Sequence, residues 1–323
     1  MKHVFIINPT SGRQDPTQGL LPRIQQAAKN TGEECLVEIT AYPGHAVELA
    51  ARYGKSGEKV RLYACGGDGT LNEVFNGAYP FPNVQVAHIP CGSGNDFIRN
   101  FGMEEQFINL GEAMRGEAAP IDLMMVNGRI CAAIASTGLD AQVAYGIPTF
   151  RRLPLCGGQM AYNLSIAQQL LGKMGKRFTV EIDGIPLPTG EYLLAAVCNG
   201  AYYGGGYCAA PNSSLEDGLL DFVLVNRISR LKIASVLSLY KKGGHVTSQG
   251  KVAPGLEGII SVHRASRIGI YPAQEGDLFV VNADGECFKA PYLEARVLPK
   301  AGQFVLHQPA AAQWKKQKQQ IIV

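Results

Sequence analysis

The chain has 323 residues, a net charge of +3, and 46% hydrophobic against 18% charged residues. This length allows two domains, and this composition excludes a disordered chain. The weak positive charge gives no argument for nucleic acid as a partner, and no apolar run approaches the roughly 18 residues that a membrane span needs. We therefore expect a globular protein without a transmembrane segment.

The eight cysteines form no C-x-x-C pair, and several lie inside apolar stretches. Buried free thiols in a reducing compartment explain this pattern better than disulfides or zinc ligands. The first eight residues lack the long apolar region and the cleavage site of a signal peptide, and they are typical of a first strand. These features predict a cytoplasmic protein.

The first third of the chain alternates strand-like and helix-like segments, which is the pattern of a parallel α/β domain. We expect this nucleotide-binding type of domain over residues 1–118. Its strands are predicted at residues 2–8, 34–40, 60–64 and 84–89, and its helices at residues 17–29, 43–53 and 71–76.

One stretch of this domain has a strong chemical signature. The strand at residues 60–64 leads into Gly66-Gly67-Asp68-Gly69-Thr70, and a helical pattern follows. Glycines between a strand and a helix let backbone N–H groups approach an anion such as phosphate. The Asp68 carboxylate would repel phosphate unless a metal or a substrate hydroxyl offsets its charge, so the turn favours phosphoryl transfer over nucleotide storage. The simple alternative is a tight Asp-Gly turn.

Two helix starts in this domain carry capping signals. Thr70 precedes the apolar positions of its helix and Glu73 follows three residues later, which predicts a capping box. Asp96 follows a second glycine turn, and it could cap a helix that runs through Phe101.

All four predicted strands end in a polar or glycine-rich turn. In an open parallel sheet such turns meet at the carboxyl edge, where ligands bind. Neither the P-loop nor the Rossmann glycine motif is present, which argues against those two nucleotide-binding folds. The polar groups available at this edge are Asn8, Ser11, Arg13, Thr40, Thr70, Asn72 and Ser93.

The chain changes character after residue 118. Short strand-like segments joined by tight turns such as Asn127-Gly128 and Asp183-Gly184 predict an antiparallel β-sandwich over residues 119–298. The segment from about residue 299 to residue 323 is expected to return to the first domain. The predicted strands are residues 121–126, 130–135, 178–182, 192–198, 219–225, 268–271 and 278–282, and the predicted helices are residues 159–171 and 230–241.

Several stretches spread over nearly the whole chain form one ordered set. They are Asn8-Pro9-Thr10-Ser11-Gly12, Thr40, Gly44-His45-Ala46, Gly66 to Glu73, Pro90 to Phe97, Asn199-Gly200, Gly204-Gly205-Gly206, Pro211, Asp217 to Asp221 and Asp284-Gly285-Glu286. In this order they resemble the soluble lipid kinase family that includes bacterial diacylglycerol kinases and the sphingosine and ceramide kinases. The first glycine block alone is shared with NAD kinases and phosphofructokinases. Arg13 stands where the family often has lysine, and an arginine also pairs with phosphate.

The resemblance implies an ATP-dependent lipid phosphotransferase with two domains and a cleft between them. A structural magnesium ion would use the Asp217 carboxylate with the main-chain oxygens of Ser214 and Leu219, because Mg²⁺ prefers hard oxygen ligands. Without the resemblance, Asp217-Gly218 indicates a plain turn. The residues expected to hold ATP are Asn8, Pro9, Thr10, Ser11, Gly12, Arg13, Thr40, Gly66, Gly67, Asp68, Gly69, Thr70, Leu71, Asn72 and Ser93.

The acidic residues receive catalytic roles under this hypothesis. Phosphoryl transfer needs an aligned hydroxyl, neutralised phosphates and a proton acceptor. Asp284 is the expected base for the acceptor hydroxyl, with Glu286 as the close alternative. Asp68 would orient the hydroxyl or bind catalytic Mg²⁺, and Asp96 would hold the groups around the γ-phosphate.

The expected acceptor is diacylglycerol, which would give phosphatidic acid, and this choice rests on the resemblance alone. The alternatives are a sphingosine or ceramide kinase, an NAD kinase, a catalytically idle nucleotide-binding regulator and a lipid carrier. The lipid would be reached at a membrane surface, where residues 146–155 mix basic and apolar side chains. An ordinary surface loop is the alternative for that segment, and a homodimer remains open.

Overall fold

The computed structural model describes residues 1–151, 158–172, 174–307, 310–311 and 314. The chain divides into two compact units, of which the first comprises Met1–Leu123 and Pro299–Val323 and the second residues 124–298. Two strands, β5 (Glu117–Val126) and β18 (Leu293–Leu306), have residues in both units. Each unit is described by itself below.

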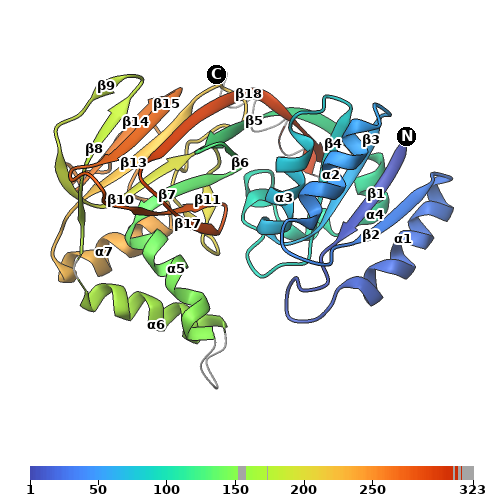
Figure 1. Cartoon of the computed structure of the whole chain (residues 1–323), viewed down its shortest axis with the longest axis horizontal. Coiled ribbons are helices and arrows are strands. Elements are labelled where there is room, and N and C mark those ends of the chain that lie inside the picture. The colour runs from blue at the N-terminus through green and yellow to red at the C-terminus, as the bar shows by residue number, and fades with distance from the viewer. Residues whose placement is uncertain (152–157, 173, 308–309, 312–313, 315–323) are drawn as a thin grey trace. The chain divides into compact units, whose positions relative to one another are not determined.

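The first unit contains a parallel sheet (Figure 1). Its strand order is β2-β1-β3-β4-β18, and every neighbouring pair in it is parallel, including Phe304 of β18 beside Val86 of β4. The predicted parallel α/β domain is therefore confirmed. The strands are β1 (Lys2–Ile7), β2 (Cys35–Ile39), β3 (Val60–Gly66) and β4 (Val84–Pro90), with the end of β18.

Helices pack on this sheet through apolar side chains. Leu20 and Ile24 of α1 and Met114 of α4 join Phe5 and Tyr63 of the sheet in one buried cluster. α2 and α3 pack closely together in front of the sheet in Figure 1. The helices are α1 (Thr17–Thr31), α2 (His45–Lys55), α3 (Asp68–Ala78) and α4 (Leu110–Arg115), with short 3₁₀ helices η1 (Phe97–Asn100) and η2 (Glu104–Phe107).

The second unit is antiparallel and rich in strands, as predicted. Its main path runs β17-β16-β7-β10-β8-β15-β18, and β13 branches from β10 to pair with β14. Phe178, Phe222 and Phe279 lie in its buried core. The strands are β6 (Arg129–Cys131), β7 (Ile134–Gly138), β8 (Lys176–Ile182), β9 (Ile185–Pro186), β10 (Gly190–Cys198), β11 (Tyr202–Tyr203), β12 (Tyr207–Cys208), β13 (Leu220–Asn226), β14 (Ile260–Ala265), β15 (Arg267–Pro272), β16 (Phe279–Ala283) and β17 (Glu286–Ala290).

The helices of the second unit are α5 (Leu139–Arg151), α6 (Gly158–Leu171) and α7 (Arg230–Lys241). α6 and α7 match the predicted helices, whereas α5 was not predicted. α5 lies beside α6, where the Ser165 hydroxyl donates to the Val143 carbonyl at 2.6 Å. Part of the proposed membrane segment, residues 146–151, therefore belongs to a helix, and residues 152–155 lie outside the described residues.

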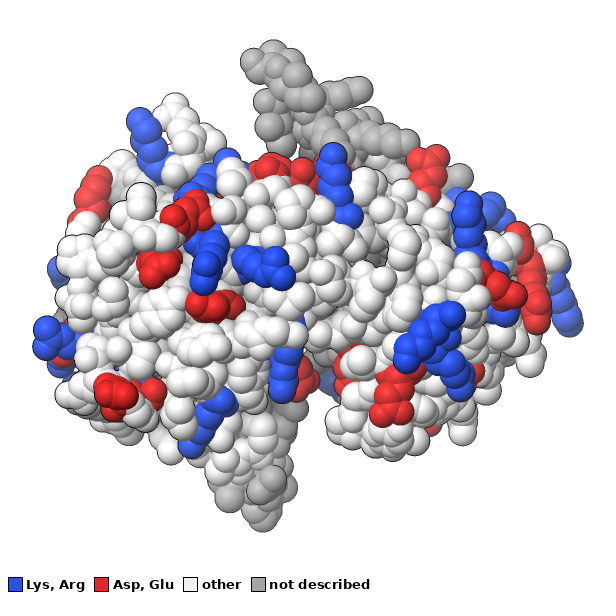
Figure 2. Space-filling view, turned by 45° about the horizontal axis from the view of Figure 1, so that its top comes forward, with Lys and Arg blue, Asp and Glu red and all other residues white. Residues whose placement is uncertain are grey.

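Among the described residues, no helix is both long enough and apolar enough to cross a bilayer. Figure 2 shows acidic and basic side chains interspersed on the face in view, as the small net charge suggests.

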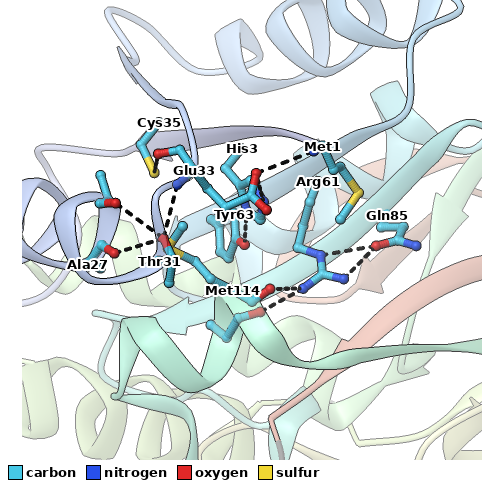
Figure 3. A network of polar contacts seen from close by, with 12 residues as sticks. Met1, His3, Ala27, Thr31, Glu33, Cys35, Arg61, Tyr63, Gln85 and Met114 are labelled. Atoms are coloured by element: carbon cyan, nitrogen blue, oxygen red, sulfur yellow. Dashed lines mark hydrogen bonds and ion pairs between the residues drawn. The ribbon is translucent and has the colours of Figure 1, made fainter.

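A buried polar network lies at the amino ends of β1 and β3 (Figure 3). His3 is 2% exposed, and its Nδ1 lies 2.6 Å from the Tyr63 hydroxyl. The neighbouring Arg61 guanidinium donates to the carbonyls of Ala113 and Met114 at the end of α4, at 2.9 and 2.8 Å. Burial, assisted by the Arg61 charge, lowers the pKa of His3 to about 4.

We expect this histidine to make the fold sensitive to mild acid. Its ordinary pKa is 6.5, so the stability that neutral His3 contributes is fully present above pH 6.5 and is lost as the pH falls toward 4. The difference corresponds to at most about 3 kcal/mol. Between about pH 7 and pH 4.5, the Tm of a His3→Asn variant should fall less than that of the wild type. If thermal melts show the same fall in Tm for His3→Asn and the wild type, His3 does not have this role.

Candidate active site

Three of the polar turns at the carboxyl edge of the parallel sheet touch one another. A Cβ placed on Gly92, after β4, would overlap the Gly67 Cα, after β3. A Cβ on Gly12, after β1, would lie 2.5 Å from the Cys91 carbonyl oxygen, and Gly12 also has a positive φ of 78°. No side chain fits at these contacts, which explains the glycines. The turns form one surface lined by backbone.

Asn8 connects the first turn to α3. Its Nδ2 donates to the Thr70 hydroxyl at 3.0 Å, and its Oδ1 accepts from both the Thr10 N–H and the Thr10 hydroxyl, at 3.0 and 2.8 Å. The Ser11 N–H donates to the Asn8 carbonyl at 3.1 Å. The bond between Asn8 and Thr70 thus holds the turn after β1 against the start of α3. The Thr40 N–H donates to the Ile7 carbonyl and keeps the end of β2 beside β1.

The predicted capping box of α3 is wrong. The helix begins at Asp68 after an extended Gly67, and no side chain caps it. The Glu73 carboxylate instead accepts the N–H groups of Gly44 and Ala46, at 2.9 and 3.2 Å, and so caps α2. Glu73 is therefore a positioning residue that sequence reasoning placed on the wrong helix, although the absence of a capping side chain before α2 was a usable signal.

Asp68 and Asp96 converge on Gly94. A Cβ on Gly94 would lie 3.0 Å from Asp68 Oδ2 and 3.6 Å from Asp96 Oδ2. Asp68 Oδ1 accepts the Phe97 N–H at 3.1 Å, and Asp96 Oδ1 lies 3.2 Å from Arg99 Nε. The expected Asp96 cap is thus made by Asp68, and the helix is the short η1. Carboxylate oxygens are ligands that Mg²⁺ prefers, so Asp68 and Asp96 are the residues of this edge that could hold it.

His88 holds the backbone at Gly66, just before the first glycine turn. It is fully buried, and its Nε2 lies 3.0 Å from the Gly66 carbonyl oxygen. Burial lowers its pKa, against the opposing effect of the Asp68 charge. A neutral His88 therefore donates from Nε2 to Gly66 and fixes the backbone before the glycine turn. Nothing in the local sequence pattern indicated this contact.

In the second unit, Asp284 anchors a hairpin between β16 and β17. Asp284 has a φ of 48°, and its carboxylate accepts the N–H groups of Ala132, Ala133 and Ile134 at 2.5, 2.9 and 3.1 Å. These contacts interrupt the predicted strand at residues 130–135, which is divided into β6 and β7. Glu286 begins β17 and is exposed. The hairpin brings both acids to one turn.

The predicted structural magnesium ligands lie in the loop before β13. Asp217 Oδ1 accepts the Leu219 N–H at 3.0 Å, and Asp217 Oδ2 accepts from the Arg264 guanidinium. Both oxygens of the only carboxylate in the set thus have donors from the protein. The set Ser214, Asp217 and Leu219 does not fit a bound divalent cation.

A further acid, Asp140, has a buried Oδ2 and was not singled out from the sequence. It lies at the start of α5, and burial raises its pKa to about 6 against hydrogen bonds that include one from Ser136. Tyr203 is near Asp140, and the Tyr203 hydroxyl lies 3.4 Å from that of Tyr240. The signal was weak because a single glycine, Gly138, precedes Asp140, and no run of glycines does.

Comparison with known proteins gives matches along nearly the whole chain. Residues 2–126 match the diacylglycerol kinase catalytic domain, and residues 133–306 match the YegS C-terminal NAD kinase beta sandwich-like domain. A crystal structure of a diacylglycerol kinase from Bacillus anthracis shares the fold, with a TM-score of 0.67, 21% identity, and coverage of 96% of this chain and 97% of that one.

Two curated relatives are more similar in sequence. A diacylglycerol kinase from Staphylococcus saprophyticus is 28% identical over 75% of this chain and 78% of its own length. A diacylglycerol kinase from Bacillus subtilis is 32% identical over 290 residues, which cover 88% of this chain and 90% of that relative. With this extent of similarity and both domain matches, the chain belongs to the diacylglycerol kinase-like family of lipid kinases.

Proposed function

We propose that this lipid kinase transfers the γ-phosphate of ATP to the hydroxyl of diacylglycerol and so produces phosphatidic acid. The observation that carries the proposal is the convergence of Asp68 and Asp96 on Gly94, at an edge built from touching glycine turns. Carboxylates beside a backbone-lined phosphate site serve a reaction with a metal and a hydroxyl better than they serve storage of a nucleotide. The named relatives support the choice of diacylglycerol.

The triphosphate would lie against the three touching turns. The helix start at Asp68 and the glycine backbone offer N–H groups, and Arg13 adds a positive charge. Asp68 Oδ2 and Asp96 Oδ2 would hold Mg²⁺, which neutralises phosphate charge when it is bound. Asn8, Glu73 and His88 would act indirectly, since their side chains hold the turns.

The acceptor hydroxyl would lose its proton to Asp284, with Glu286 as the alternative. Three backbone N–H groups hold the Asp284 carboxylate in one orientation. These bonds make the carboxylate a weaker base, but a carboxylate offers about four lone-pair sites, so it can still accept from an arriving hydroxyl in a defined direction. The fixed orientation of the Asp284 carboxylate supports its role as the base, because phosphoryl transfer depends mainly on alignment and charge stabilisation.

The lipid would be collected at a membrane surface by the second unit. Leu171 at the end of α6 is 83% exposed, and Leu231 at the start of α7 is 90% exposed. Arg230 ties these helix ends together, because its guanidinium donates to the carbonyls of Leu170 and Gly172 at 2.6 and 2.9 Å. Exposed leucines beside basic residues suit contact with an anionic bilayer.

One assay tests the proposal. The protein is incubated with labelled ATP and Mg²⁺, and with diacylglycerol, sphingosine, ceramide or NAD as acceptor. We expect label in phosphatidic acid, and higher turnover on diacylglycerol in anionic vesicles than on a soluble short-chain form. Label only in a sphingoid lipid or only in NAD would refute the proposed acceptor, and no ATP-dependent label in any acceptor would refute the reaction.

A further inference from the structure

The loop before β13 is held by an arginine from the neighbouring strand. β13 and β14 are antiparallel, with Asp221 directly opposite Arg264. The Arg264 guanidinium donates to Asp217 Oδ2, and its Nε lies 3.6 Å from Asp221 Oδ1. A single guanidinium thus lies between two carboxylates, one in the loop and one at the start of the strand.

The loop itself supplies the second donor to Asp217. The Leu219 N–H reaches Asp217 Oδ1 at 3.0 Å across Gly218, whose φ of 73° allows the tight turn. Asp217 therefore has an internal donor on each oxygen. A divalent cation could bind here only by displacing one of them or by sharing an oxygen with the guanidinium.

Sharing is unfavourable because both groups are positive. The guanidinium carries a positive charge, so it repels a nearby cation. The Asp217 and Arg264 side chains are 31% and 49% exposed, and such an ion pair adds little stability. A Mg²⁺ site with one carboxylate is weak as well, since Mg²⁺ gives up its water reluctantly. The modest Asp217–Arg264 ion pair is therefore sufficient to compete with Mg²⁺ for the Asp217 carboxylate.

We propose that the Arg264 guanidinium takes the place of a divalent cation at this loop, so that the loop keeps its shape without a bound ion. The residues involved all belong to the second unit. The inference is independent of the acceptor lipid and of any Mg²⁺ that accompanies the nucleotide. Its failure would leave the proposed reaction untouched.

Thermal unfolding without nucleotide tests this inference. The wild type, Arg264→Ala, Asp217→Asn and the double variant are each melted in EDTA and in Mg²⁺ at about 10 mM. Removal of Arg264 frees a carboxylate oxygen, so Mg²⁺ should raise the Tm of Arg264→Ala by about 3 °C. The double variant should lack this rise. Any change in Tm that Mg²⁺ causes in the wild type should be the same in Asp217→Asn.

Arg227→Ala is the matched control. Arg227 pairs with Glu191 at 2.6 Å, and the two side chains are 52% and 51% exposed. Its loss should bring no new Mg²⁺ response. The inference is overturned if the wild-type response disappears in Asp217→Asn, if Arg264→Ala gains no response, or if Arg227→Ala gains the same one. Should Arg264→Ala not fold, the comparison of wild type with Asp217→Asn still decides.

Discussion

Asp68→Asn should lower kinase turnover by about 100- to 1000-fold and leave the fold intact. The loss is expected because the neutral amide can neither hold Mg²⁺ as the carboxylate would nor balance charge beside the γ-phosphate. The fold should survive because the side-chain carbonyl of the substituted asparagine can still accept the Phe97 N–H that Asp68 Oδ1 accepts at 3.1 Å. Turnover is measured with labelled ATP and diacylglycerol vesicles, and folding by circular dichroism and thermal melts.

Asp122→Asn provides a control for neutralising an acid of the same unit. Asp122 Oδ1 accepts the Lys300 N–H at 2.7 Å, and an asparagine retains that acceptor. Gly94→Ala keeps both acids and adds a methyl group 3.0 Å from Asp68 Oδ2 and 3.6 Å from Asp96 Oδ2. We expect near-normal turnover for Asp122→Asn and a higher Mg²⁺ requirement for Gly94→Ala. Near-normal turnover of Asp68→Asn would remove Asp68 from the reaction.

The parts of the fold that sequence predicted are those set by local rules. α1 ends before Gly32, which has a φ of 70°, and β1, β3 and β4 each run into the expected turn. Glycine conformation and the apolar pattern of buried strands act over a few residues, so a single sequence reveals them. Contact between the turns followed from the topology of a parallel sheet.

The errors arise where distant segments meet. Glu73 caps α2 rather than α3 because the chain brings Gly44 to it. The strand predicted at residues 130–135 is broken because Asp284, 150 or more residues away, takes its N–H groups. Arg264 reaches Asp217 only through the pairing of β13 with β14. Such contacts depend on tertiary structure, and no local pattern encodes them.

Helix α5 was missed for a different reason. Gly146 and Pro148 are both poor helix formers, so the local pattern favoured a loop. In the structure, Gly146 is required by packing, because a Cβ there would lie 2.5 Å from the Ser165 hydroxyl of α6. Packing against α6 thus stabilises α5 although its own residues have a low helix propensity, since helices in proteins are stabilised mostly by tertiary packing.

Asp284→Asn and Glu286→Gln should separate the two candidate bases. We expect Asp284→Asn to lower kcat by about 100-fold or more, as loss of a general base does. Its Tm should fall too, because the asparagine NH₂ would face a backbone N–H that now donates to the carboxylate. Glu286 is exposed, so Glu286→Gln should preserve the Tm and change kcat much less. Initial rates and thermal melts on the same preparations give both quantities.

The structural part of the Asp284 effect can be measured on a second hairpin. Asp183 also has a positive φ and a glycine after it, and its Oδ1 accepts the N–H groups of Ser266 and Arg267 at 3.0 and 2.8 Å. Both bonds use Oδ1, which an asparagine would retain, so the control is Asp183→Ala, which removes them and should lower the Tm without lowering kcat. If Asp284→Asn loses no more turnover than Asp183→Ala while Glu286→Gln loses nearly all of it, then Glu286 is the base and Asp284 only positions the turn. Near-normal kcat in both site variants would place the proton acceptor elsewhere, because neither carboxylate would then be needed for the hydroxyl to react.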